Sequence, residues 1–110
     1  MVLNPIIGSV EAEKILAYLI ARGSGYALEI ARFYDSNLRG IQKQLDKLEH
    51  GGVLYSRKIG RTRVYEFNPR YPFLKELQEL LKKAIDFYPA DLQERLWIRR
   101  ERPRRRGKPE

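Results

Sequence analysis

Cysteine is absent from the 110-residue chain, so every chemistry that needs a thiol is excluded. Those chemistries are disulfide bonds, thiolate zinc sites, redox switches and cysteine nucleophiles. Histidine is scarce as well: His50 is the single one, near an expected helix end. A solvated side chain that interacts with the helix dipole is the ordinary role of histidine there. We therefore expect no metal site and no cofactor.

Long apolar runs and catalytic motifs are also missing. The apolar runs fall far short of the roughly 20 residues that cross a bilayer, and residues 1–9 lack the layout of a signal peptide. We expect a cytoplasmic protein with no membrane partner. There is no glycine-rich phosphate loop and no Ser, His, Asp arrangement, and carboxylates such as Asp86, Asp91 and Glu94 fall on charged helix faces. We predict no catalytic residue and no enzyme activity.

Basic residues are in excess, with 22 Lys and Arg against 14 Asp and Glu and a net charge of +8. This balance favours a polyanionic partner, nucleic acid ahead of an anionic membrane. The excess is uneven, because residues 99–110 hold seven basic and two acidic residues. Residues 101–110 contain little besides Arg, Pro, Gly and Lys, so they are predicted to form a disordered tail. The chain length favours one domain, residues 1–89, followed by a short helix at 90–100 and this tail.

Three amphipathic helices are predicted in the first half of the chain. Ser9 is a suitable N-cap for a helix over residues 10–22, and a shorter helical pattern spans residues 26–34. After a short break, Asn37 can cap a third helix that runs to Glu49 and is stopped by a glycine pair. The apolar stripe of the third helix consists of Leu38, Ile41, Leu45 and Leu48. Two helices joined by about three residues are typical of a helix-turn-helix.

A hairpin and a long helix are predicted next. Residues 53–59 and 63–67 are rich in β-branched and aromatic residues, and the glycine-containing segment 60–62 between them favours a turn. Pro72 suits the first turn of a helix over residues 72–88. The apolar positions of that helix are Phe73, Leu74, Leu77, Leu80, Leu81, Ala84 and Tyr88. The order of elements predicts a mostly α fold of the α+β class: a winged helix-turn-helix with a three-helix core, a β-hairpin wing and an added C-terminal helix.

The outward face of the third helix carries hydrogen-bond donors that suit base reading. Arg pairs bidentately with guanine, Gln with adenine, and Lys reaches guanine or phosphate. The expected base-reading residues are Arg39, Gln42 and Lys43, and Asn37 and Lys47 are expected to contact the DNA backbone. The alternative for this face is an ordinary solvated surface of an amphipathic helix.

The hairpin is basic around its turn. Arg57 and Lys58 lie on the first strand, Arg61 in the turn and Arg63 on the return strand. We expect these four side chains to contact the DNA backbone or the minor groove beside the third helix. The alternative is protection of an exposed strand, since Lys and Arg at edges block aggregation.

The order of these elements resembles the ArsR-like winged helix family of prokaryotic transcriptional regulators. The resemblance covers about residues 10–88 and rests on residues 29–31, 41–48 and 52–54, and on Gly60 and Tyr65. These match the family's second-helix signature, recognition helix, glycine before the wing, and wing hairpin. The chain departs from the metal-sensing branch, because it has no cysteine pair and no comparable ligands in its last helix. Residues 65–77 also resemble winged helix modules found beside small nucleotidyltransferase domains.

Together these patterns predict a sequence-specific double-stranded DNA-binding transcriptional regulator. Helix 37–49 would enter the major groove, while wing 53–67 contacts the backbone or the minor groove. Helix 72–88 has more apolar surface than a small domain covers, so we expect a homodimer. The expected dimer interface consists of Leu77, Leu80, Leu81 and Ala84. Two alternatives stay open: a winged-helix protein-interaction module, and an RNA-binding protein without specific DNA readout.

Overall fold

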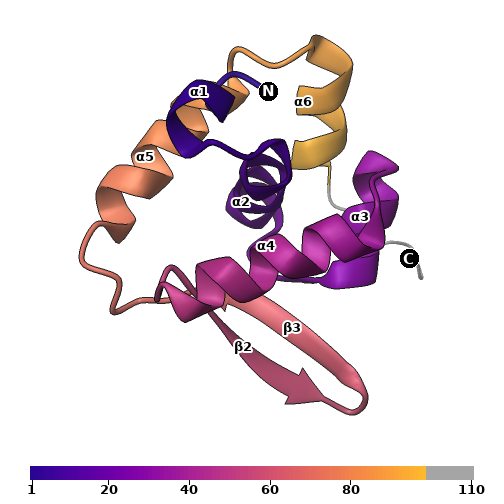
Figure 1. Ribbon diagram of the computed structural model, residues 1–110. Coiled ribbons are helices and arrows are strands. Elements are labelled where there is room, and N and C mark those ends of the chain that lie inside the picture. Colours follow the sequence, from indigo (N-terminus) through magenta and orange to yellow (C-terminus); the bar gives the residue numbers. More distant parts are fainter. Residues whose placement is uncertain (99–110) are drawn as a thin grey trace, which may run out of the picture.

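The computed structural model describes residues 1–98, and it shows helices packed around one central helix and a small sheet at one end (Figure 1). In chain order the elements are α1 (Asn4–Ile7), α2 (Val10–Arg22), β1 (Gly25–Tyr26), α3 (Ala27–Tyr34), α4 (Leu38–His50), β2 (Leu54–Ile59), β3 (Thr62–Phe67), α5 (Leu74–Ile85) and α6 (Ala90–Trp97). The predicted winged helix-turn-helix is confirmed. The predicted tail, residues 101–110, lies outside the described residues. Within residues 1–98, no helix is long and apolar enough to cross a membrane.

Two of the helices begin where their side-chain caps predict. The Ser9 hydroxyl oxygen accepts a hydrogen bond from the backbone N–H of Ala12 at 3.1 Å and opens α2. Asn37 Oδ1 accepts one from the N–H of Gly40, also at 3.1 Å, and opens α4. These caps satisfy donors that the first turn of a helix leaves without a partner.

The sheet has three antiparallel strands in the order β1-β3-β2, one strand more than expected. The unpredicted strand β1 has two residues and pairs Gly25 with Tyr65. A Cβ at position 25 would lie 2.9 Å from Cε1 of Tyr18, so glycine is what lets this strand pass over that ring. The hairpin turn is tighter than expected, since Ile59 pairs with Thr62. Gly60, with a φ of 62°, supplies the positive φ that such a turn needs at its first central position.

Helix α2 forms the centre of the core, as eight of its 13 residues are buried. The stripe of α4 packs against it through Ile41 and Leu45, both fully buried. Leu38 was expected on the same stripe, but it is 37% exposed because it is the first residue of α4 and precedes the buried contact. Burial of such side chains stabilises the fold by about 1.5–3 kcal/mol each.

Helix α5 is shorter than predicted and packs on α2 with residues assigned above to a dimer interface. Leu81 is fully buried and Ala84 is 4% exposed within one chain, so the core of that chain already covers both side chains and leaves little of them for a second copy. An apolar stripe shows that a face is buried, but not which chain covers it. Leu77 is half-buried against the same core, whereas Leu80 is 40% exposed. The α-helix ends at Ile85 because the N–H groups that follow bond to carbonyls three residues back instead of four, as that of Asp86 does to the Lys83 carbonyl at 3.1 Å.

Candidate nucleic-acid interface

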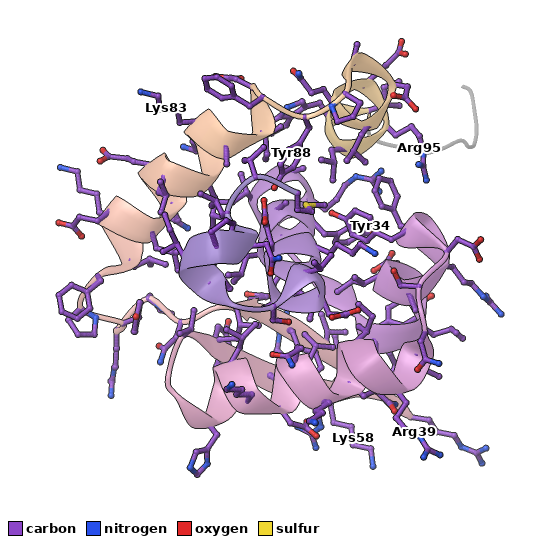
Figure 2. The ribbon with its side chains drawn as sticks, turned by 45° about the horizontal axis from the view of Figure 1, so that its top comes forward. Tyr34, Arg39, Lys58, Lys83, Tyr88 and Arg95 are labelled. Carbon is purple, nitrogen blue, oxygen red and sulfur yellow. The ribbon has the colours of Figure 1, made fainter. Side chains whose placement is uncertain are left out.

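The outward face of α4 presents its polar side chains to solvent as the sequence predicts. Arg39, Gln42, Lys43 and Lys47 are all exposed. Within residues 1–98 the one ion pair is Arg57 with Glu66, so the cations of α4 are not neutralised by described carboxylates. Arg39 and Lys58 point outward at the edge of the molecule where α4 lies (Figure 2). This face offers guanidinium, ammonium and amide donors to a ligand.

Asn37 is exposed, but its side chain already forms the hydrogen bond that caps α4. Its oxygen accepts the capping bond from Gly40, so only the amide NH₂ is left to donate. A contact of Asn37 with a phosphate oxygen is compatible with that arrangement, because the phosphate accepts.

The strand register separates the four basic residues of the hairpin. Residues that face each other in the register lie on one side of the sheet, and neighbours along a strand lie on opposite sides. Lys58 pairs with Arg63 and shares a side with the buried Leu54. Arg57 pairs with Val64 and lies on the opposite side.

Arg57 is tied to an acidic neighbour on that opposite side. Its Nη2 donates to Glu66 Oε2 at 2.8 Å, and the Tyr55 hydroxyl donates to Glu66 Oε1, also at 2.8 Å. These hydrogen bonds, that of Arg57 first, lower the pKa of the Glu66 carboxyl below its usual range. Arg57 therefore contributes less free positive charge than Lys58, Arg61 or Arg63.

A chain of hydrogen bonds joins the hairpin to α4. Arg63 Nη1 donates to Ser56 Oγ at 3.0 Å, and the Ser56 hydroxyl donates to Glu49 Oε2 at 2.6 Å. Glu49 belongs to α4, so the hairpin is held at a set position beside this helix. Sequence reasoning missed Ser56 and Glu49, since neither belongs to a basic pattern.

A groove of about 600 Å³ lies between the hairpin and α4. Gln42 and Asp46 line it from α4, and Arg61, Thr62 and Arg63 line it from the hairpin. The start of α3 closes it with residues 26–28. Sequence reasoning missed Tyr26 and Leu28, because the pairing of β1 with β3 brings them there and two residues carry no detectable strand pattern. Asp46 places one negative charge in an otherwise basic groove.

Within residues 1–98, no group of three His, Asp or Glu side chains is arranged to hold a metal ion. His50 is the last residue of α4 and is exposed, as expected.

Several solved structures share this arrangement of helices and sheet. BldR from Sulfolobus solfataricus, a transcriptional regulator, matches with a TM-score of 0.55 at 18% identity over 77% of this chain and 64% of BldR. The fold is that of winged-helix transcriptional regulators. A variant of ZitR from Lactococcus lactis in its apo form matches with a TM-score of 0.54 at 15% identity over 84% of this chain and 79% of ZitR. The adhesin competence repressor AdcR from Streptococcus pyogenes gives 0.52 at 12% identity, over 84% of this chain and 77% of AdcR.

No family model matches the chain, and no curated protein matches its sequence. The resemblance to the ArsR-like branch therefore stays a prediction. At these identities the solved structures establish the fold alone.

Proposed function

We propose that the protein is a sequence-specific double-stranded DNA-binding regulator of transcription without catalytic activity of its own. The observation that carries the proposal is the shared groove, which α4 lines with Gln42 and the hairpin lines with Arg61 and Arg63. An α-helix fits the major groove of B-DNA, and a hairpin beside it then lies over the adjoining backbone. The neighbours BldR and AdcR, a transcriptional regulator and a repressor, support this proposal.

The roles follow from the side of each element on which a residue lies. Arg39, Gln42 and Lys43 read base edges from α4, with Asn37 and Lys47 on the flanking phosphates. Lys58, Arg61 and Arg63 contact backbone or minor groove from the hairpin. Arg57 faces away and is paired with Glu66, so we assign it a minor role.

We further propose that the protein acts as a homodimer through the outward face of α5. Phe73, Leu80 and Phe87 are 62%, 40% and 67% exposed. Leu80 lies on α5, Phe73 directly precedes the helix and Phe87 lies two residues past its end, so the three side chains follow one another along the line of α5. A second copy would cover this line, and a two-fold axis would give the DNA site two related halves.

Selection from random duplexes tests the function directly. Purified protein should enrich duplexes that share one site, and the site should be protected from cleavage. Preference for RNA over the enriched duplex would favour the RNA-binding alternative. Equal binding to enriched and scrambled duplexes, with salt-resistant binding to a protein partner, would favour the interaction module and contradict the proposal.

A further inference from the structure

On the side of α2 next to α3 and α6, a second cleft has a volume of about 490 Å³. Arg22 of α2, Arg32 of α3 and Arg95 of α6 line it, together with Phe33 and Ile98. We propose that this cleft binds a small organic anion, with an oxyanion group held by the guanidinium groups and a compact apolar body against the ring and aliphatic walls. The volume lies within the roughly 300–1,000 Å³ of small-molecule pockets.

Positive charge in the cleft is not balanced by the described residues. None of its three arginines forms an ion pair within residues 1–98. Glu29 is the one acidic residue in the lining, and its Oε1 accepts a hydrogen bond from the N–H of Tyr26 at 3.3 Å, where it caps α3. Guanidinium groups that converge on one cleft repel each other, and an anion between them removes that cost.

Two of the guanidinium groups are already oriented. Those of Arg22 and Arg95 lie 5.3 and 4.4 Å from the centre of the Phe33 ring. Such stacking fixes the plane of a guanidinium, which presents a fork that matches the two oxygens of a carboxylate or phosphate. Arg22 donates to two carbonyls through Nε and Nη2, so N–H donors remain from its set of five.

The walls suit an apolar body. Tyr18 and Phe33 meet edge to face with ring centres 5.3 Å apart, and Ile98, 47% exposed, closes the cleft beyond α6. A purely inorganic anion would leave these apolar walls without a partner. The cleft therefore favours an anion with an attached ring or short hydrocarbon over inorganic phosphate.

An anion in the cleft would also affect the hydrogen bonds that hold α6 against α2 and α3. Arg22 donates to the carbonyls of Leu96 at 3.0 Å and Arg95 at 2.9 Å, near the end of α6, and Arg95 donates to the carbonyl of Phe33 in α3. An anion held by the remaining donors of Arg22 and Arg95 would therefore bind to the same side chains that join α6 to α2 and α3. Since α3 is the first helix of the helix-turn-helix, binding in the cleft should change DNA affinity, a consequence that rests on the proposed function.

Titration calorimetry on the full chain without DNA tests the site, with benzoate, phenyl phosphate, benzamide and inorganic phosphate as probes. The two organic anions should bind saturably, while neutral benzamide shows no binding and inorganic phosphate binds at least tenfold more weakly. Arg32→Gln, at an exposed position that holds no part of α6, should weaken the organic anions about tenfold or more. Arg70→Gln, an exposed arginine outside the cleft, is the matched control and should leave binding unchanged.

Absence of saturable binding would overturn the proposal, and so would affinities that Arg32→Gln leaves at the wild-type value. Loss of affinity in Arg22→Gln as well as in Arg32→Gln, with both variants folded by circular dichroism, would support it. The calorimetry contains no DNA, so its result is independent of the duplex selection. Anion binding in a protein that selects no DNA site would support the anion site and refute the proposed function. Anion binding that leaves the affinity for a selected duplex unchanged would sustain the site and refute the coupling.

Discussion

The hydroxyl of Tyr88 donates a 2.6 Å hydrogen bond to Oε2 of Glu13, a charged side chain that is fully buried. The same carboxylate accepts the backbone N–H of Val2 at 3.0 Å and that of Leu3 at 2.9 Å. A carboxylate that leaves water must recover its hydrogen bonds from the protein. Glu13 therefore joins the N-terminal residues, α2 and the segment between α5 and α6, and Tyr88 lies at the centre of that junction (Figure 2).

Tyr88→Phe should lower the free energy of unfolding by about 1–3 kcal/mol, because it leaves the buried carboxylate one donor short. Urea denaturation followed by circular dichroism measures this change. Tyr71→Phe is the matched control, since Tyr71 is half-buried and its hydroxyl forms no hydrogen bond within residues 1–98. Equal stability losses in the two variants would contradict the role given to Tyr88.

Alkaline pH should weaken the fold through buried phenols. Burial, first among the causes, raises the pKa of Tyr34 and Tyr88, and it raises the pKa of Tyr18 to about 12. A group whose pKa is raised on folding contributes stability that is fully present below its unfolded pKa, here about 10, and is lost above it. The stability of the wild type relative to Tyr34→Phe should thus be constant from pH 8 to 10 and fall from pH 10 to 12. A difference that stays constant to pH 12 would refute the raised pKa.

How far the sequence predicts the structure depends on the range of the interactions. The helix starts after Ser9 and Asn37 could be predicted, because an N-cap forms a hydrogen bond with residues next to it in the chain. The burial of Ile41 and Leu45 also follows from their helical spacing. The pairing of Gly25 with Tyr65 joins residues far apart in the chain and leaves no local pattern. The spacing of Leu81 and Ala84 likewise could not tell a core within one protomer from a dimer interface.

The same limit applies to the candidate site. Strand alternation alone puts Arg57 and Lys58 on opposite sides of the hairpin. Only the register brings Arg57 to Glu66, and only the packing of the hairpin on α4 brings Ser56 to Glu49. The exposed donors of α4 could be predicted, whereas their neighbours in the groove could not.

Neighbouring wing residues should differ in their effect on DNA affinity. Lys58→Ala should weaken binding to all duplexes and lower the slope of log affinity against log salt by about 0.9, the value for one lost phosphate contact. Arg57→Ala should change that slope much less, because Arg57 is paired with Glu66 on the other side. Titrations at several salt concentrations decide this, and a larger slope change for Arg57→Ala would contradict the assignment of sides.

Leu80→Glu should convert the proposed dimer into monomers, since it buries a carboxylate without a partner in an apolar interface. Leu80 is 40% exposed in one protomer, so the variant should keep its fold. Lys82→Glu is the control, because Lys82 is an exposed charge on the same helix but lies two residues, about half a helical turn, from Leu80. Sedimentation gives the oligomeric state, and a wild-type protein that is monomeric at micromolar concentration would refute the interface.

Base reading by α4 is tested most directly by the discrimination between a selected duplex and a scrambled one. Lys43→Ala and Arg39→Ala should each reduce that discrimination by about 1–3 kcal/mol at the affected base pair, while the thermal unfolding curve is unchanged. Lys75→Ala, an exposed lysine on α5, should leave both affinities as they are. Preserved discrimination in the α4 variants, with equal weakening on both duplexes, would show that α4 binds only phosphate and would contradict base reading.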